Sequence, residues 1–306
     1  MITLEALSKR YGETTAVDAL ELTVSPGQVT GFLGPNGAGK STTMRMILGL
    51  DAPTQGRALV DGRPYAEWPV PLAKVGALLD AKALHPRRSA RNHLIAMARS
   101  NGIPVSRVDE VLSVVGLDEV GRKRAGQFSL GMGQRLGIAG ALLGDPEVLM
   151  FDEPVNGLDP DGVRWVRRLM RKLAAEGRTV FVSSHLMSEM QLTADQLVVI
   201  GRGRLIANAP IADVIAGSSR ATVRLRIPAP SDLALLRDRL LPEAEQVASG
   251  EVPGQLVVAG VPAERIGDLA HELGVRLHEL HTERASLEEA YMELTADSVE
   301  YGVVAS

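Results

Sequence analysis

Short apolar runs predict buried strands in the first two thirds of the chain. They cover residues 29–33, 148–151 and 180–182. A helical pattern follows the first run, with apolar side chains at Met44, Ile47, Leu48 and Leu50. Strands of this length with helical segments between them predict an α/β fold whose main sheet is parallel.

The pattern changes near Ser218, and the tail alternates between strands and helices. The segments "ATVRLRI", "GQLVVAG" and "VRLHELH" predict strands, whereas "DLALLRDRLL" and "PAERIGDLAHEL" predict helices. This order predicts a small α+β domain of the βαββαβ type over 218–306. The segment "ASLEEAYMELT" predicts a last helix, because Ser286 and Glu289 have the spacing of a capping box.

The composition is that of a globular protein, and it excludes several kinds of chemistry. Hydrophobic residues make up 45% and charged residues 23% of the 306 positions, which is typical of folded proteins. Disulfides, thiolate metal sites and cysteine nucleophiles are excluded because the sequence has no cysteine. The formal net charge of −4 argues against general binding to nucleic acid. No secretory signal and no apolar run of about 18 residues is present, so we expect a cytoplasmic chain.

A glycine-rich segment after the first apolar run has the G-x-x-x-x-G-K-[ST] pattern of a phosphate-binding loop. We call residues 34–41 the phosphate loop. Glycines let the backbone wrap around phosphates, and amides at a helix N-terminus donate hydrogen bonds to anions. Lys40 is expected to reach the β- and γ-phosphates, and the Ser41 hydroxyl to bind Mg²⁺. The predicted nucleotide-binding residues are Gly34, Pro35, Asn36, Gly37, Ala38, Gly39, Lys40, Ser41 and Thr42.

Two adjacent carboxylates, Asp152 and Glu153, follow the second apolar run. Parallel α/β sheets bind their ligands at the carboxyl ends of strands. We therefore expect Asp152 to hold Mg²⁺ through its hydration shell and Glu153 to act as general base on the attacking water. An acid pair of this kind favours hydrolysis over transfer to a bound acceptor, because water needs only a nearby base.

Five motifs in this order resemble those of the ATP-binding cassette (ABC) family. They are the phosphate loop, "FSLGMGQR" at 128–135, "VLMFDEP" at 148–154, "NGLD" at 156–159 and "SSH" at 183–185. The resemblance covers about residues 1–215. It implies an α/β P-loop NTPase cassette over 1–217, with a RecA-like core sheet, an antiparallel β part and a helical lobe over about 81–145.

In the ABC family, the second glycine motif starts a helix that contacts the γ-phosphate of ATP held by the opposite subunit. The resemblance assigns this role to Ser129, Leu130, Gly131 and Met132, and it implies a homodimer as the working state. A hydroxyl and a bare backbone at a helix N-terminus suit an anion. Leu130 and Met132 depart from the family pattern L-S-G-G-Q. We expect the site to work, with an altered affinity for closure.

Further roles follow from the same resemblance. His185 matches the histidine that senses the γ-phosphate and orients Glu153 and the water. Tyr11 matches the aromatic residue that stacks on adenine, and the alternative is a half-buried tyrosine of a strand. The family's loop across the dimer interface is matched by Asn156, Gly157, Leu158 and Asp159.

The end of the predicted strand "KVGALLD" departs from the family pattern. The family has a glutamine here that contacts Mg²⁺, and this sequence has Asp80. A carboxylate remains a hard oxygen ligand, but it is shorter and adds negative charge beside the triphosphate. Asp80 is therefore either a Mg²⁺ ligand beside Ser41 and Asp152 or an exposed loop acid. Acidic residues at this place resemble the antibiotic-exporter branch of the daunorubicin- and bacitracin-resistance type.

The resemblance implies an ATPase that uses ATP and Mg²⁺, has Glu153, His185 and Lys40 as catalytic residues, and powers a separate transmembrane permease. We expect export of a drug, an antibiotic or another hydrophobic substrate, by a subunit held on the cytoplasmic face of the membrane through the permease. The alternative is a soluble ABC-type ATPase acting on nucleic acid or ribosomes. Such proteins commonly carry two cassettes or long coiled coils, which this sequence lacks. A module that binds ATP without hydrolysis is a third reading, which Glu153 and His185 disfavour.

Overall fold

The computed structural model describes residues 1–80, 83–216, 222–250, 252–283 and 286–295. Contacts between residues divide the chain into two units, the first from Met1 to Pro210 and the second beginning at Ile211. The expected boundary at 217/218 lies outside the described residues. Within the described ranges, no helix is both long enough and apolar enough to cross a membrane.

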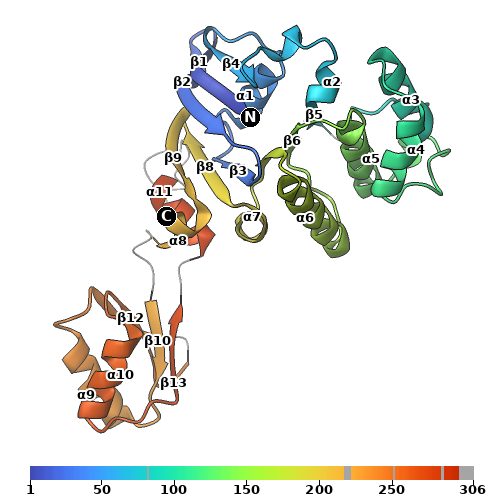
Figure 1. Ribbon diagram of the computed structural model, residues 1–306. Helices are drawn as coiled ribbons and strands as arrows, with labels where there is room; N and C mark the ends of the chain where they lie inside the picture. The colour runs from blue at the N-terminus through green and yellow to red at the C-terminus, as the bar shows by residue number, and fades with distance from the viewer. Residues whose placement is uncertain (81–82, 217–221, 251, 284–285, 296–306) are drawn as a thin grey trace. The chain divides into compact units, whose positions relative to one another are not determined.

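The first unit contains a six-stranded sheet in the order β5-β6-β7-β3-β8-β9 (Figure 1). The strands are β3 (Val29–Leu33), β5 (Val75–Leu78), β6 (Val148–Asp152), β7 (Thr179–Ser183), β8 (Gln196–Gly201) and β9 (Arg204–Pro210). All neighbours are parallel except β9, which pairs antiparallel with β8. The three strands predicted from apolar runs are confirmed as β3, β6 and β7. They are apolar because they lie inside the sheet and every residue of β3 and β7 is buried.

A second sheet of the first unit is antiparallel and has the order β2-β1-β4. Its strands are β1 (Ile2–Tyr11), β2 (Thr14–Val24) and β4 (Gln55–Val60). Helix α1 (Lys40–Ile47) shares one buried cluster with both sheets, in which Met44 and Ile47 join Leu4 of β1 and Phe32 of β3. This shared core fixes the start of α1, and with it the phosphate loop.

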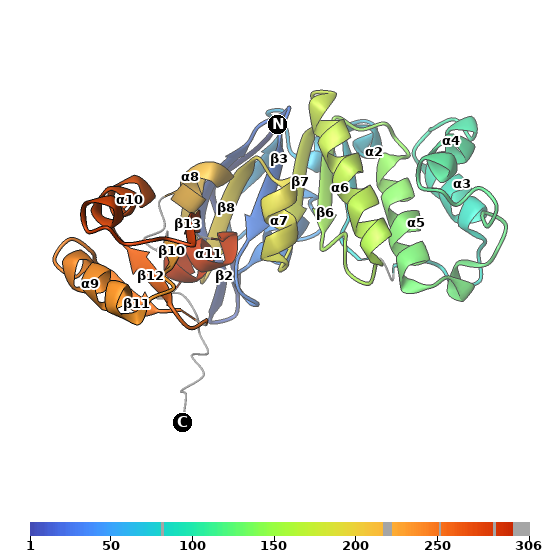
Figure 2. The ribbon, with the colours of Figure 1, turned by 90° about the horizontal axis from the view of Figure 1, so that it is seen from below.

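The other helices of the first unit have two places. The helices are α2 (Pro71–Lys74), α3 (Ala90–Ser100), α4 (Ser106–Val114), α5 (Leu130–Leu142), α6 (Pro160–Ala175) and α7 (Met187–Thr193), with short 3₁₀ turns at Tyr65–Glu67 and Ala125–Gln127. Helices α3, α4 and α5 pack on one another as the helical lobe, and others cover the parallel sheet (Figure 1). Helices α6 and α7 cover one face of the sheet (Figures 1 and 2). Helix α5 approaches the edge strand β5 closely, since a Cβ at Gly137 would lie 2.5 Å from Leu78 Cδ1. The glycines of α5 thus permit close packing.

The second unit has the βαββαβ order that the alternation of the tail predicts. It contains α8 (Ile211–Ala216), β10 (Thr222–Arg226), α9 (Pro230–Leu240), β11 (Gln246–Ser249), β12 (Gln255–Ala259), α10 (Ala263–Glu272), β13 (Glu279–Glu283) and α11 (Leu287–Thr295). The four strands form an antiparallel sheet in the order β11-β12-β10-β13, and α9 and α10 share its hydrophobic core.

Two predictions for the second unit have different outcomes. The strand expected over "VRLHELH" is wrong in its start, because Val275 lies in the turn that follows α10 and β13 begins only at Glu279. The Val275 amide donates to Ala270 O at 2.8 Å, after Gly274 in a left-handed conformation. The capping box is confirmed, since Glu289 accepts from the Ser286 amide at 2.7 Å and the Glu289 amide donates to Ser286 Oγ at 3.2 Å.

Candidate functional site

The phosphate loop leaves the buried strand β3 and ends in α1. Gly39 has a φ of +102°, and a Cβ there would lie 2.4 Å from Ala16 O, so this position requires glycine. Lys40 folds back over the loop, and its Nζ donates to Gly34 O at 2.6 Å and to Pro35 O at 3.2 Å. Burial lowers the pKa of Lys40, and the nearby Glu153 and Asp152 carboxylates oppose that shift.

Two hydroxyl groups hold the Asp152 carboxylate at the end of β6. Ser41 Oγ donates to Asp152 Oδ2 at 2.9 Å, and Ser183 Oγ donates to Asp152 Oδ1. Asp152 and Ser183 are register partners of the parallel strands β6 and β7. The sequence predicts no role for Ser183 beyond its place in the motif "SSH", although its position directly after an apolar run is a signal that could have marked it.

Glu153 has a left-handed backbone, with a φ of +51° that is uncommon for a residue other than glycine. Its amide donates to Ser183 Oγ at 3.1 Å and to Ser183 O at 3.3 Å. Its carboxylate Oε2 lies 2.8 Å from His185 Nδ1 and accepts from the His185 amide at 3.4 Å. The His185 side chain is 55% exposed and that of Glu153 is 24% exposed. Solvent therefore reaches the pair, while the hydrogen bonds to Ser183 hold the backbone of Glu153.

These groups surround a cavity of about 320 Å³, which we call the phosphate cavity. Its lining is Ala16, Asn36, Gly37, Ala38, Gly39, Lys40, Ser41, Thr42, Asp152 and Glu153. The structure therefore brings seven of the nine predicted nucleotide-binding residues, 36–42, and both predicted acids to one place, whereas Gly34 and Pro35 do not line the cavity. A cavity with loop amides, an ammonium group and a hydroxyl beside two carboxylates suits a polyphosphate bound with a divalent cation.

The donors at the phosphate cavity fit Mg²⁺. The Ser41 hydroxyl and the Asp152 carboxylate are hard oxygen donors that lie within 2.9 Å of each other. Within the part of the chain that the structure describes, no three His, Asp or Glu side chains form a metal cluster. Two protein oxygens with a bound phosphate are a common Mg²⁺ arrangement, so the ion would be held together with the nucleotide.

The residues of the second glycine motif lie elsewhere in the same subunit, and none of them lines the phosphate cavity. Ser129 caps α5, because its Oγ accepts from the Met132 amide at 3.3 Å. Ser129 and Leu130 line another cavity, of about 230 Å³, beside Phe128. Gly131 and Met132 are partly exposed in the first turn of α5.

The predicted dimer loop, residues 156–159, also lies outside the lining of the phosphate cavity. Asp159 caps α6, since its Oδ1 accepts from the Gly162 amide at 2.8 Å. The Asn156 amide donates to Glu153 O at 3.2 Å, so the loop begins in a turn that starts at the predicted base.

Tyr11 and Asp80 are predicted site residues that lie outside the lining of the phosphate cavity. Half of Tyr11 is exposed, and its hydroxyl donates to Asp51 Oδ2 at 3.1 Å. Desolvation and Asp51 raise the pKa of Tyr11, against smaller opposing contributions from Thr42 and Arg45. Asp80 is exposed two residues beyond β5.

The sequence predicts no contact for Gln134 or Arg135, yet both have partners within the protein. Gln134 is only 3% exposed, and its Nε2 donates to Glu153 O at 2.9 Å. Arg135 Nη1 donates to Val115 O at 3.0 Å, and its guanidinium lies 4.7 Å from the Trp165 ring centroid. Both are polar residues in an otherwise apolar helix, which is the signal that marks them as partnered.

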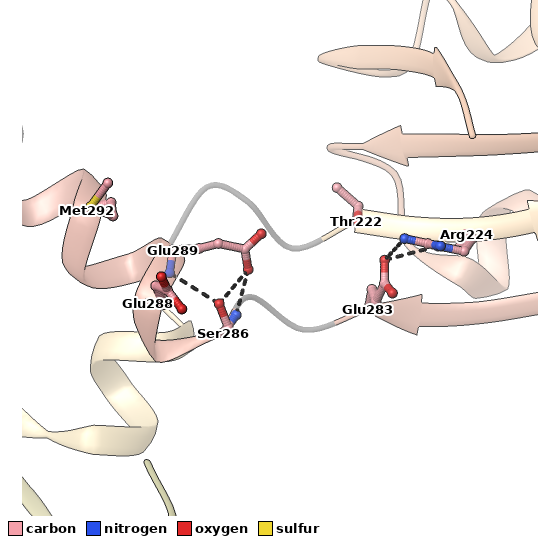
Figure 3. A pocket seen from close by; sticks show the side chains of 7 residues that line it. All are labelled: Thr222, Arg224, Glu283, Ser286, Glu288, Glu289 and Met292. Atoms are coloured by element: carbon pink, nitrogen blue, oxygen red, sulfur yellow. Dashed lines mark hydrogen bonds and ion pairs between the residues drawn. The ribbon is translucent and has the colours of Figure 1, made fainter. Parts of the chain in front are cut away.

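A cavity of about 550 Å³ in the second unit has a different character (Figure 3). Two of the glutamates in its lining are engaged within the protein. Glu283 Oε2 accepts from Arg224 Nη2 at 2.8 Å, and Glu289 accepts from Ser286 Oγ at 2.9 Å (Figure 3). These contacts link β10 to β13 and cap α11, so they serve the fold of the unit.

Family models match both units. A model described as ABC transporter matches residues 17–156, which include the phosphate loop and both carboxylates. A model described as domain of unknown function (DUF8746) matches residues 221–288.

Individual proteins are similar over longer ranges. The bacitracin transport ATP-binding protein BcrA of Bacillus licheniformis is 44% identical over 207 residues, which are 67% of this chain and 68% of BcrA. The Nod factor export ATP-binding protein I of Paraburkholderia xenovorans (strain LB400) is 36% identical over 301 residues, 96% of each chain. A solved structure of an ATP-binding subunit of an ABC transporter has a TM-score of 0.65 and 25% identity, covering 71% of this chain and 92% of its own.

Proposed function

Because the chain belongs to the ABC transporter family, we propose that it hydrolyses ATP at the phosphate cavity and thereby drives export through a separate membrane protein. The contact between Glu153 and His185, 2.8 Å long, carries the proposal. It places a carboxylate and an imidazole at the edge of a cavity that the phosphate loop lines. The ends of three parallel strands, β3, β6 and β7, supply these groups.

Lys40 and the loop amides bind the triphosphate in this proposal. The ammonium group already donates to two carbonyl oxygens of the loop, and phosphate oxygens would take over these hydrogen bonds. Ser41 and Asp152 would hold Mg²⁺, with Asp80 as a further ligand, and the ion would supply charge neutralisation. Tyr11 would stack on the adenine ring.

Glu153 acts as the general base. Its carboxylate takes a proton from water as the water oxygen attacks the γ-phosphorus, and the bond to the bridging oxygen of ADP breaks. The His185 Nδ1 atom must carry a proton to bond an ionised Glu153, because both carboxylate oxygens are acceptors. This fixes the carboxylate and leaves the other ring nitrogen of the exposed His185 to sense the γ-phosphate.

A second copy of the chain would complete each site. Ser129, Leu130, Gly131 and Met132 begin a helix that lies away from the phosphate cavity of their own subunit. A helix N-terminus with a serine cap favours an anion, so these residues would contact the γ-phosphate of the partner. The loop of Asn156, Gly157, Leu158 and Asp159 would cross between the subunits.

The similar proteins guide the choice of substrate and location. BcrA is named for bacitracin transport and the Nod factor protein for export. We propose that this subunit serves export of a drug, an antibiotic or another hydrophobic compound, held at the cytoplasmic face of the membrane by its permease. Neither relative supports the alternative role on nucleic acid or ribosomes.

The first test is ATP hydrolysis by Glu153→Gln. Loss of the base should lower kcat by about 10²–10⁴-fold, while MgATP still binds and brings two subunits together. Glu119→Gln is the matched control, because Glu119 is an exposed glutamate of the helical lobe and should leave the rate unchanged. A parental rate in Glu153→Gln would remove Glu153 from the mechanism.

A second test concerns the partner. Tagged Glu153→Gln, loaded with MgATP in its native cell, would be recovered from gently solubilised membranes. We expect a multi-spanning membrane protein in constant ratio to the ATPase. Ribosomes or nucleic acid in its place would contradict the transport role.

A further inference from the structure

We propose that Gln134 is a positioning residue for the general base, acting through the backbone of Glu153. The inference rests on the proposed role of Glu153 and deepens it. Gln134 lies on α5, in the helical lobe, and its amide Nε2 donates to Glu153 O at 2.9 Å. A side chain of one lobe thus holds the main chain that carries the base in the other.

The surroundings of Gln134 show why this hydrogen bond matters. The side chain is 3% exposed on a helix whose buried neighbours include Leu136, Ile138 and Ala139. A buried amide without a partner is costly, by about 1–3 kcal/mol. An apolar residue would satisfy the packing of α5 alone, so the polar side chain at this position points to its partner.

The backbone of Glu153 requires support from outside its own turn. A residue other than glycine in the left-handed region costs on the order of 1–3 kcal/mol and persists where neighbours hold it. Here the Glu153 amide is held by Ser183 of β7, and its carbonyl is held by Gln134 of α5. The Asn156 amide also donates to Glu153 O, at 3.2 Å, but Asn156 belongs to the same turn and would move with it.

Without the Gln134 hydrogen bond, only one side of the Glu153 peptide would be fixed to the rest of the protein. Rotation of that turn would carry the Glu153 carboxylate away from His185 Nδ1, now 2.8 Å distant. Binding of the triphosphate would be little affected, because its ligands belong to the phosphate loop and α1. The expected signature is therefore a lower kcat at an unchanged KM.

The same helix gives Gln134 a second consequence. Ser129 caps the N-terminus of α5, and in the proposed dimer it contacts the nucleotide of the partner. A shift of α5 on that contact reaches Glu153 through Gln134. One hydrogen bond thereby links occupation of one site to the alignment of the base in the other.

The structure offers a way to remove this bond without moving α5. Arg135 anchors the helix independently, through Val115 O and the Trp165 ring. Gln134→Met removes the donor and keeps an unbranched side chain of similar length, so we expect the variant to fold. Gln246→Met is the matched control, because Gln246 is exposed on β11 in the second unit.

The experiment measures ATP hydrolysis and ATP-driven dimerisation of the full chain. We expect Gln134→Met to lower kcat at least about tenfold with KM for ATP within twofold, and Gln246→Met to match the parent. In a Glu153→Gln background, Gln134→Met should change neither the residual rate nor the ATP concentration that gives half-maximal dimer. If the methionine variant is insoluble, Gln134→Glu takes its place. This variant keeps the shape of the side chain, loses the donor when ionised, and should lower kcat in the same way.

Two results would overturn the inference. One is hydrolysis by folded Gln134→Met within twofold of the parent. The other is a loss of ATP-driven dimerisation when Gln134→Met is added to Glu153→Gln, in parallel with the loss of kcat in Gln134→Met. This result would mean that Gln134→Met displaced α5. A parental rate in Glu153→Gln would contradict the role of Glu153 as general base. A slow Glu153→Gln together with a parental rate in Gln134→Met would contradict only the role of Gln134.

Discussion

The side chain of Leu130 packs directly on Gly157, and a Cβ at Gly157 would lie 2.1 Å from Leu130 Cδ2. The contact is reciprocal in the next residues, since a Cβ at Gly131 would lie 3.2 Å from Leu158 Cδ2. The second glycine motif and the predicted dimer loop therefore interlock within one subunit. Leu130, which departs from the family glycine, is accommodated because the opposite position has no side chain.

Gly157→Ala should consequently destabilise the protein and slow hydrolysis. The left-handed backbone at Gly157, with φ +73°, costs an alanine about 1–2 kcal/mol, and the overlap with Leu130 adds overpacking of about 1–3 kcal/mol. Leu130→Gly should remove the second contribution. Thermal unfolding of both single variants and the double variant measures the coupling. Strictly additive losses would show that the two residues do not depend on each other.

Asp51 should control how tightly the nucleobase is held. Its carboxylate accepts from the Tyr11 hydroxyl and, at 2.8 Å, from Arg45 Nε of α1, so it orients the Tyr11 ring from the helix that follows the phosphate loop. If Tyr11 stacks on adenine, Asp51→Ala should weaken MgATP binding by part of the stacking energy, about 1–3 kcal/mol. Binding of inorganic tripolyphosphate, which has no base, should stay the same.

Calorimetry with both ligands tests the role of Asp51. Asp118→Ala serves as the control, since Asp118 is an exposed aspartate of the helical lobe. An equal loss for ATP and tripolyphosphate would mean that Asp51 supports the phosphate loop and has no specific effect on the base.

Ser183→Ala should disturb the positions of both the Asp152 and the Glu153 carboxylates. Ser183 Oγ donates to Asp152 and accepts from the Glu153 amide, and the residue is fully buried. The variant would leave a buried amide with a single longer partner, at a cost of about 1–3 kcal/mol in the free energy of unfolding. We expect a higher Mg²⁺ concentration for half-maximal hydrolysis and a kcat at least about tenfold lower. Ser100→Ala, at an exposed helix position, should change neither, and an unaltered Mg²⁺ dependence in Ser183→Ala would contradict the role.

Features that are local in the chain were predictable from the sequence, whereas contacts between distant segments were not. The phosphate loop and the acid pair were predictable because each strand, loop and helix involved is contiguous in the chain. The contact of Ser183 with Asp152 depends on β6 and β7 being neighbours, which an apolar run cannot indicate. The bond from Gln134 to Glu153 joins two lobes, and no periodicity encodes it.

The second unit shows the same limit at its margins. The strands β10, with buried alternate residues, and β12, with four of its five residues buried, follow their predicted segments. By contrast, β11 has no fully buried residue, so its pattern carries little signal. From the sequence, Leu130 is only a departure from a family motif. The space that accommodates its side chain is left by Gly157, which lies outside that motif.

His93 should make the protein less stable in mild acid. Burial lowers the pKa of His93, and the charges of Arg88 and His85 lower it further; its Nδ1 is buried without a hydrogen-bond partner among the described residues. The unfolded chain then binds a proton more readily, so this stability is present above the unfolded pKa and is lost as pH falls through the folded pKa. His93→Gln should lose less stability between about pH 7 and 5, by under about 1.4 kcal/mol per pH unit. Urea unfolding across this range measures the slope, and equal slopes in parent and variant would show that His93 titrates normally.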